Sequence, residues 1–373
     1  MKELKLEGIR SIIFRGMKRD GFLSHSVCDP SEIFLSTFSR GFIWLISSRM
    51  KILVTGGAGF IGSHVVRRLL KNAHSITVID DFNDFYDPSI KRANVASFGG
   101  PVEIEEMDLR DWGATQRVFE KVRPEAVIHL AARAGVRPSI ADPKLYIDTN
   151  ITGTFHVLEA ARLLGSKKVV FASSSSVYGL SKTVPFREDF PVLQTLSPYA
   201  ATKIAGEHLC GNYVNLHGMR IACLRFFTVY GPGQRPDLAI HGFTDAIENG
   251  RPIKQFGDGS TRRDYTYIDD IVQGVMGALS YVDGEEPLFE IFNLGESETT
   301  TLSQLISKIE KALGKKAIIE RLPEQKGDMP LTAADITKAR TLLGYAPSTP
   351  IREGIPKFVS WYRELHSRKQ GER

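Results

Sequence analysis

Short apolar runs alternate with amphipathic stretches along the chain after residue 50. The apolar runs lie at 51–55, 75–80, 126–130, 168–172 and 220–226, a further short strand is expected at 102–106, and helical patterns cover 60–71, 112–122, 146–164 and 198–217. Runs of this length, separated by helices, are typical of buried parallel strands with right-handed crossovers. The pattern therefore predicts an α/β fold, a Rossmann-like, doubly wound parallel sheet.

The pattern changes after Gly231, where Pro232, Gly233 and Pro236 mark an irregular loop. Shorter elements follow, with helices near 239–248, from 268, at 302–313 and near 336 and 351, and strands near 253–256, 289–294 and 318. We expect 50–231 to bind a dinucleotide. Residues 232–373 would form mainly a smaller C-terminal α/β lobe that binds the substrate, with segments at about 256–281 returning to the first domain.

The first 49 residues fit neither part. Their most apolar stretch, 33–48, is interrupted by Arg40 and Gly41 and is too short to span a bilayer. The order of cationic, apolar and small residues that marks a signal peptide is also missing. Because Met50 directly precedes the first strand, we expect the natural chain to begin there and 1–49 to be poorly ordered or an artefact of the assigned start. A weak membrane-surface anchor is the alternative.

Composition and charge narrow the class of protein. The chain is 42% hydrophobic with a net charge of +5, and residues 1–49 carry eight basic and five acidic side chains, so the rest is nearly neutral. This gives no electrostatic reason to expect nucleic acid as a partner. Three widely spaced cysteines, Cys28, Cys210 and Cys223, indicate neither a disulfide framework nor a metal site and fit a reducing cytoplasm. No motif of two histidines and a carboxylate stands out, so we expect no metal.

A glycine-rich turn joins the first strand to the first helix. Gly56, Gly59 and Gly62 allow a tight turn and close approach of a pyrophosphate, which the N–H groups of the helix N-terminus can bind. Asp80 ends the second strand, where an acid can bond both ribose hydroxyls and repel a 2′-phosphate. These residues predict NAD as the cofactor, although Asp80 could also be a simple turn residue.

Several of these positions share one property, because they follow the carboxyl ends of predicted strands. They are Gly56, Asp80, Ala131, Ser174 and Phe227. Ligands of doubly wound sheets bind at that edge, so we expect these positions to converge on one crevice. The small side chains of Ala131 and Ala132 would leave room for a cofactor.

Tyr199 and Lys203 place a phenol and an amine four residues apart in the first turns of a predicted helix. Residues at i and i+4 share a face. An ammonium beside a phenol favours the phenolate, so we expect the pKa of Tyr199 to be lowered and its oxygen to transfer protons near neutral pH. A packed tyrosine beside a solvated lysine is the plain alternative.

Four segments together, at 55–62, 173–179, 199–203 and 263–270, resemble the extended short-chain dehydrogenase/reductase superfamily and its nucleotide-sugar epimerases. The resemblance runs from Lys51 to about Tyr362. It implies that Ser174, Tyr199 and Lys203 form the catalytic group and that NAD stays bound and is regenerated in each cycle. The expected cofactor contacts are Gly56, Gly59, Phe60, Ile61, Gly62, Asp80, Asp81, Asp108, Leu109, Leu130, Ala131, Ala132, Tyr199 and Lys203.

Segments 131–137, 225–237 and 327–330 are similar to one subfamily, the UDP-glucuronate 4-epimerases. The resemblance implies interconversion of UDP-glucuronate and UDP-galacturonate through a 4-keto sugar. Arg235 is our candidate for the sugar carboxylate, which a guanidinium can bind at two points, and Arg263 for the diphosphate. The expected substrate contacts are Ser175, Ser176, Thr228, Arg235, Arg263 and Asp328.

Other interpretations stay open. A UDP-glucuronate decarboxylase usually carries an acid at the position of Ser176, and a 4,6-dehydratase needs an Asp–Glu pair where this chain has Ser175 and Ser176. A UDP-glucose or UDP-N-acetylglucosamine 4-epimerase is the nearest alternative, and a non-catalytic dinucleotide sensor is another class. Arg235 could be a solvated loop residue, and Arg263 could pair with Asp264. The resemblance also implies a homodimer formed through helices 146–164 and 198–217.

Overall fold

The computed structural model describes residues 49–181, 183–324 and 329–371. The predictions for residues 1–48 and for Asp328 fall outside these ranges. Within them, no helix is both long enough and apolar enough to cross a membrane.

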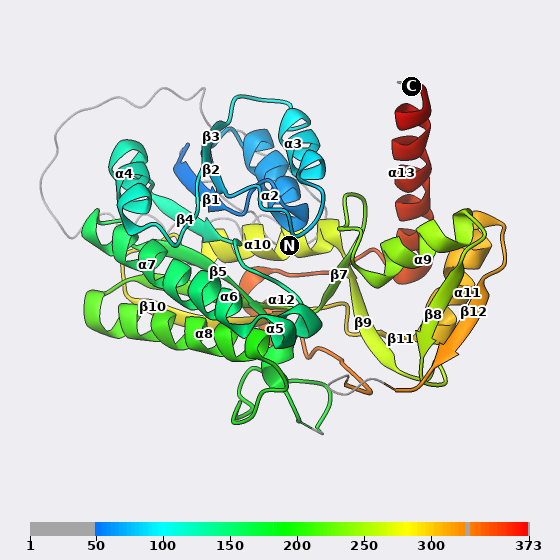
Figure 1. Cartoon of the computed structure of the whole chain (residues 1–373). Coiled ribbons are helices and arrows are strands. Elements are labelled where there is room, and N and C mark those ends of the chain that lie inside the picture. Colours follow the sequence, from blue (N-terminus) through cyan, green and yellow to red (C-terminus); the bar gives the residue numbers. More distant parts are fainter. Residues whose placement is uncertain (1–48, 182, 325–328, 372–373) are drawn as a thin grey trace, which may run out of the picture. The chain divides into compact units, whose positions relative to one another are not determined.

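Seven parallel strands form the main sheet (Figure 1). They are β1 (Lys51–Thr55), β2 (Ser75–Asp80), β3 (Glu103–Glu106), β4 (Ala126–His129), β5 (Lys168–Ser174), β6 (Arg220–Phe226) and β10 (Leu288–Leu294). Their order is β10-β6-β5-β4-β1-β2-β3, and every neighbouring pair is parallel. The predicted doubly wound parallel sheet is confirmed. Its edge strand β10 was not foreseen as part of it, because the expected return to the first domain ended near residue 281.

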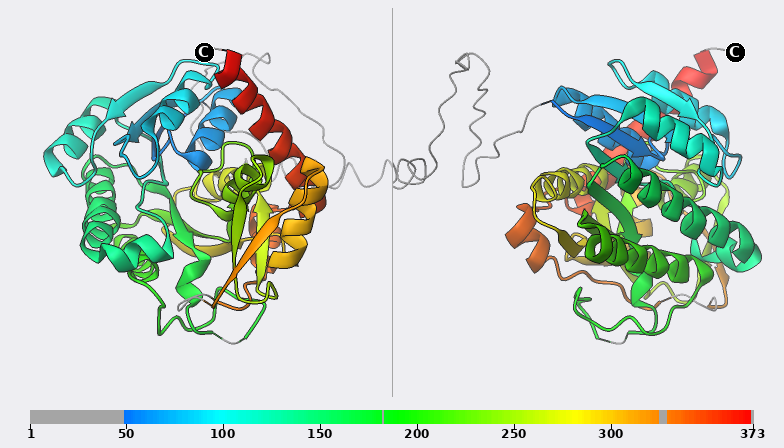
Figure 2. Two further views of the ribbon diagram at one scale, coloured as in Figure 1. Left: turned by 45° about the vertical axis from the view of Figure 1, so that its right-hand side comes forward. Right: turned by 90° about the vertical axis from the view of Figure 1, so that its left-hand side faces the viewer.

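Helices cover both faces of this sheet (Figure 2). One face carries α2 (Phe60–Lys71), α10 (Ile268–Tyr281) and α12 (Thr337–Leu343), and the other carries α4 (Trp112–Val122), α7 (Gly153–Leu163) and α8 (Pro198–His217). Because successive strand residues point to opposite faces, Ile52 and Val54 join one core while Leu53 joins the other. Burial on both faces explains why the central strands β1, β4 and β5 are largely apolar, whereas the edge strand β3 is not.

The predicted helix 146–164 is interrupted. It consists of the end of α6 (Pro143–Ile147), a π-helical turn at Asp148–Thr152, and α7. The wider turn contains Asn150, whose amide donates to the Arg133 carbonyl at 2.9 Å and to Thr202 Oγ1 at 3.0 Å. Thr202 lies on α8, so this turn connects α8 to the segment after β4. Short helices α3 (Pro88–Ala96) and α5 (Val136–Ala141) complete this part of the chain.

A C-terminal lobe lies beside the carboxyl edge of the sheet (Figure 1). It contains β7 (Thr228–Tyr230), α9 (Ala239–Glu248), β8 (Pro252–Phe256), β9 (Arg262–Tyr267), β11 (Thr299–Thr301), α11 (Leu302–Leu313), β12 (Ile318–Leu322) and α13 (Ile351–Gly371). Strand β9 pairs with β7 in parallel and with β11 antiparallel, and β8 pairs with β12 in parallel. The chain returns from this lobe to the main sheet for α10, β10 and α12.

Candidate functional site

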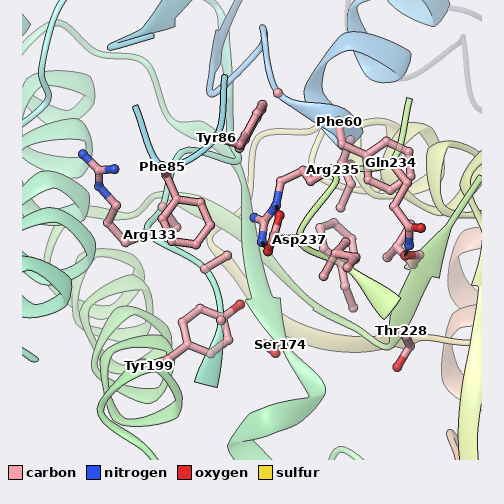
Figure 3. Close-up of a pocket in the computed structure, with 18 of the residues that line it drawn as sticks. Phe60, Phe85, Tyr86, Arg133, Ser174, Tyr199, Thr228, Gln234, Arg235 and Asp237 are labelled. Atoms are coloured by element: carbon pink, nitrogen blue, oxygen red, sulfur yellow. Dashed lines mark hydrogen bonds and ion pairs between the residues drawn. The ribbon is translucent and has the colours of Figure 1, made fainter. Parts of the chain in front are cut away.

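A cavity of about 840 Å³ opens at the carboxyl ends of the central strands, between the main sheet and the C-terminal lobe. All five strand-end positions that we expected to converge line it, namely Gly56, Asp80, Ala131, Ser174 and Phe227. The lobe supplies the opposite wall, including Lys254, Phe256 and Tyr265. Two loops cross between these walls, and Figure 3 shows Phe85 and Arg235, one from each loop, above Tyr199.

The glycine turn has the shape that a pyrophosphate requires. Gly56 has φ +70°, and a Cβ atom there would lie 2.7 Å from the Ala131 backbone nitrogen. A Cβ atom on Gly62 would lie 2.1 Å from the Gly56 carbonyl oxygen, so only glycine lets α2 begin this close to the turn. No side chain caps α2, and Gly59, Phe60, Ile61 and Gly62 line the cavity. The uncapped helix N-terminus can therefore receive an anion.

Asp80 is more constrained than the sequence suggested. Its buried carboxylate accepts hydrogen bonds from the backbone N–H groups of Ala58 at 3.2 Å and Phe82 at 3.0 Å, and its Oδ1 lies 2.8 Å from Lys91 Nζ. The neighbouring Asp81 faces both Lys91 and Arg133, at 3.4 Å and 3.5 Å. Asp80 thus fixes the glycine turn as well as bordering the cavity, and two cations balance the two acids.

The remaining expected cofactor contacts also lie on the cavity wall. They are Asp81, Asp108, Leu109, Leu130, Ala131, Ala132, Tyr199 and Lys203. The cavity thus runs from the acids at the end of β2 to the tyrosine of α8, and its residues fit an elongated dinucleotide.

Tyr199 and Lys203 are presented by the N-terminal half of α8. The helix begins where Ser197 accepts a hydrogen bond from the Ala200 N–H at 3.2 Å and Pro198 occupies the first turn. Ser174, at the end of β5, lines the same cavity as Tyr199 and acts to lower its pKa. The Lys203 ammonium lies 5.9 Å from the centre of the Tyr199 ring and donates to the Ala172 carbonyl at 2.7 Å. The three predicted catalytic residues are therefore together.

The expected lowering of the Tyr199 pKa is wrong for the protein alone. Burial raises this pKa, and the hydrogen bond with Ser174 and the charge of Arg235 only oppose the rise. Burial makes the phenolate form of Tyr199 unfavourable, because it removes the negative charge from water. The Lys203 ammonium does not compensate for this, since its own hydrogen bond goes to the Ala172 carbonyl. A further positive charge in the cavity is needed to make Tyr199 a base near neutral pH.

Burial has the corresponding effect on Lys203, whose pKa it lowers to about 8. The folded protein then releases this proton near pH 8, whereas the unfolded chain keeps it to about pH 10.5. Between these values the unfolded state binds more protons, so raising the pH stabilises the fold.

We expect Lys203→Met to remove this pH dependence. In protein stripped of dinucleotide, the free energy of unfolding of the unsubstituted chain should rise by up to about 3 kcal/mol relative to the variant between about pH 8 and 10.5. Urea unfolding at several pH values measures it. Lys71→Met, which changes an exposed lysine of α2, serves as the control and should leave the profile unchanged. Parallel curves for Lys203→Met and the unsubstituted chain would contradict the assigned burial.

Arg235 is not the solvated loop residue of the plain alternative, and it can bind a substrate only if its ion pair with Asp237 opens. Its side chain is 18% exposed, and its Nε and NH2 groups pair with both carboxylate oxygens of Asp237 at 2.9 Å and 2.7 Å. The guanidinium also lies 5.2 Å from the centre of the Phe85 ring (Figure 3). Its two-point fork points into the cavity near Tyr199, where a ligand carboxylate could take the place of Asp237.

The other expected substrate contacts divide into two groups. Thr228 and Arg263 line the cavity, whereas Ser175 and Ser176 do not. Ser176 instead bonds Ser174, with their Oγ atoms 3.1 Å apart. Arg263 donates to the Met329 carbonyl at 2.5 Å.

Asp264 occupies a different environment from its neighbour Arg263. It is fully buried and accepts hydrogen bonds from the backbone N–H groups of Glu296, Ser297 and Ala334. Burial raises its pKa to about 6 against these bonds. Asp264 therefore ties β9 to two later segments of the chain.

Some cavity residues were not foreseen from the sequence. Phe85 and Tyr86 come from the loop after β2, Lys91 from α3, Arg133 from the segment after β4, and Asp237 from the loop before α9. The aromatic pair in the loop after β2 was one signal, and Arg133 and Asp237 lie in the family-like segments 131–137 and 225–237. The ion pairs of Lys91 with Asp80 and of Arg133 with Asp81 were not visible in the sequence, because the fold brings these partners together.

Comparisons with known proteins agree with this geometry. The model of the NAD dependent epimerase/dehydratase family matches residues 52–295. A UDP-glucuronate 4-epimerase from Thermodesulfobacterium geofontis is 44% identical over 316 residues, which cover 84% of this chain and 96% of that protein.

Two solved structures have the same fold. A UDP-glucuronic acid 4-epimerase from Bacillus cereus, in complex with UDP-glucuronic acid and NAD, is 38% identical, with a TM-score of 0.79 over 85% of this chain and 100% of that one. A UDP-glucose 4-epimerase from Thermus thermophilus, in complex with NAD, is 32% identical, with a TM-score of 0.76 over 84% and 99%.

Proposed function

The chain belongs to the NAD-dependent epimerase/dehydratase family, and we propose that it is a UDP-glucuronate 4-epimerase that interconverts UDP-glucuronate and UDP-galacturonate. The observation that carries the proposal is the position of Arg235. Its guanidinium, which can bind a carboxylate at two points, lies in the same cavity as Ser174 and Tyr199. It is close enough for its positive charge to lower the pKa of the phenol. A neutral sugar has no need of such a cation at that place.

The proposed reaction begins at the sugar 4-hydroxyl. Tyr199 removes its proton, Ser174 donates a hydrogen bond to the 4-oxygen, and Lys203 stabilises the phenolate. NAD held along the glycine turn and Asp80 would supply a reversible hydride acceptor for C4, with return of the hydride to the opposite face, and a positively charged nicotinamide ring near the phenol. That charge is what the buried Tyr199 lacks in the protein alone. Tyr199 returns the proton to the 4-oxygen, and no net oxidation occurs because the hydride also returns to C4.

A uronic acid creates a risk of side reaction. A 4-keto sugar with a carboxylate on C5 is a β-keto acid, which loses CO₂ when the bond to the carboxylate is aligned with the carbonyl π system. We propose that Arg235 exchanges Asp237 for the sugar carboxylate and holds it out of this alignment. Thr228, on the same wall, would add a hydroxyl contact.

The nucleotide end of the substrate would occupy the lobe side of the cavity. Arg137 and Arg263 lie there, together with the side chains of Phe256 and Tyr265. Arg137 packs over the Phe256 ring, with 5.1 Å from its guanidinium carbon to the ring centre. Two guanidinium groups beside aromatic rings suit a diphosphate next to a uracil.

Incubation of the purified protein with UDP-glucuronate, followed by NMR or chromatography of the products, tests the proposal. We expect UDP-galacturonate without UDP-pentose. UDP-pentose as the main product would mean a decarboxylase, and turnover of UDP-glucose alone would mean a UDP-glucose 4-epimerase.

We also propose a homodimer formed through α7 and α8. These helices lie side by side, and together with α6 they expose Ile147, Phe155, Leu163 and Leu216. A face of large apolar side chains is typical of a subunit interface. The unsubstituted protein should have twice the monomer mass in light scattering, and Leu216→Asp should halve it.

Cys210 and Cys223 are both unpaired, which supports a cytoplasmic location.

A further inference from the structure

A buried ion pair lies directly behind the proposed catalytic group. Glu207 is on α8, one turn after Lys203 and on the same face. Its carboxylate binds Arg225 of β6 at two points, from Nε at 2.9 Å and from NH2 at 2.8 Å. Ser173 Oγ donates a third bond at 2.5 Å. The two charged side chains are only 7% and 3% exposed.

The pair connects α8 to two adjacent strands. Ser173 directly precedes Ser174 and lies opposite Arg225 in the register of β5 and β6. The bond from Lys203 to the Ala172 carbonyl makes a second polar connection to β5. Because these connections are one helical turn apart, they fix both the rotation of α8 and its position along the strand.

The apolar part of this contact does not by itself set that position. Gly206 faces the ring of Phe171, and a Cβ atom there would lie 2.4 Å from Phe171 Cζ. Such close apolar packing sets how near the helix lies to the sheet, but it has little directional preference. Buried charges are directional, because a displaced partner would be left unpaired away from water.

We propose that Glu207, held by Arg225 and Ser173, is a positioning residue that sets α8 on the sheet so that Tyr199 and Lys203 face Ser174. Neither Glu207 nor Arg225 lines the cavity, so each acts through the catalytic group. Arg225 also stacks on the Tyr178 ring at 4.8 Å, and Tyr178 donates to Asn293 of β10 at 2.7 Å. The inference rests on the proposed function, since it assumes the roles of Ser174, Tyr199 and Lys203.

Glu207 also affects the charge of Lys203. Its carboxylate, with Cys210, opposes the lowering of the Lys203 pKa by burial, and the other titratable neighbours are Tyr199 and the neutral His129 of β4. Without the Glu207 charge, the Arg225 cation would act unopposed and lower this pKa further.

Glu207→Gln keeps the shape of the side chain and removes its charge. We expect kcat for UDP-glucuronate to fall about tenfold or more, because small displacements of reacting groups are costly, while KM stays within about threefold. The alkaline limb of the kcat profile should move to lower pH, since Lys203 loses its proton earlier. The NAD content per protein should not change.

Arg225→Lys and Arg225→Met form a graded pair. Lysine keeps the charge but loses the fork, so its kcat should lie between those of the unsubstituted protein and the methionine variant. This pair also provides the test if Glu207→Gln does not fold. Lys168→Met is the matched control, because it breaks the Lys168–Asp283 ion pair at the opposite end of β5. It should lower the unfolding temperature with little change in kcat.

The outcomes separate the two proposals. A folded, NAD-loaded Glu207→Gln with kcat within about twofold and an unshifted pH profile would overturn the positioning role alone. The positioning role is also overturned if Lys168→Met and Glu207→Gln lose equal stability and their kcat values fall by the same factor. If the unsubstituted protein turns over no UDP-sugar, the proposed function fails and the positioning role falls with it.

Discussion

Tyr199→Phe should lower kcat for UDP-glucuronate about 10³-fold or more, while the protein still carries its NAD. The phenylalanine ring fills the same space against Tyr146, whose ring centre lies 6.3 Å away, so the end of α8 should keep its packing. The variant lacks only the oxygen that Ser174 contacts and that would remove the substrate proton. Initial rates of UDP-galacturonate formation and the NAD released on denaturation are the two measurements.

Tyr146→Phe is the matched control. Tyr146 is a buried core residue whose hydroxyl donates to the Ala134 carbonyl at 3.0 Å. This hydroxyl takes no part in the proposed proton transfer between Tyr199 and the sugar. We expect kcat within about threefold of the unsubstituted protein. A Tyr199→Phe enzyme that kept a tenth of its activity would show that another group is the base.

Arg235→Ala should damage turnover of the uronic acid selectively. Loss of a two-point bond to a buried carboxylate should lower kcat/KM for UDP-glucuronate about 30-fold or more, equivalent to about 2 kcal/mol. UDP-glucose has no carboxylate, so its binding should change by less than about threefold. Any remaining UDP-glucuronate turnover should yield UDP-pentose, because the freed carboxylate can align for loss of CO₂.

The partner of Arg235 provides the control for this experiment. Asp237→Asn leaves the arginine in place and weakens only its internal ion pair, so affinity for UDP-glucuronate should stay equal or increase. Titration calorimetry with UDP-glucuronate and UDP-glucose measures both variants. Equal losses for the two ligands in Arg235→Ala would remove the carboxylate contact from the mechanism.

The features that the sequence predicted correctly are local ones. The strand, the glycine turn and the helix at 51–71 follow one another directly, so their geometry depends on neighbouring residues. Tyr199 and Lys203 are four residues apart on one helix. The convergence of the strand ends followed from parallel topology alone, and all five positions line one cavity.

The features that the sequence could not supply depend on distant partners. Asp80 stabilises the glycine turn because Lys91 and the Ala58 N–H reach it. Arg235 and Asp237 are only two residues apart, but the sequence does not show that the loop brings their side chains together. The pKa of Tyr199 was predicted in the wrong direction, since spacing on a helix shows a neighbouring cation but not the loss of water. Edge strand β10 escaped notice because its place in the sheet is decided by pairing with β6, far away in sequence.

The path of the chain between sheet and lobe limits how this protein can move and how it can be divided. The chain enters the lobe after β6, returns for α10 and β10, leaves again for β11 and comes back for α12. A rigid-body hinge motion of the lobe would strain each of these connections. We therefore expect ligands to enter the cavity through movement of the loops that carry Phe85 and Arg235. A fragment ending at residue 231 would expose the unpaired edge of β6 and would be prone to aggregate. The sheet and the lobe therefore have to be kept together in any shortened version of the protein.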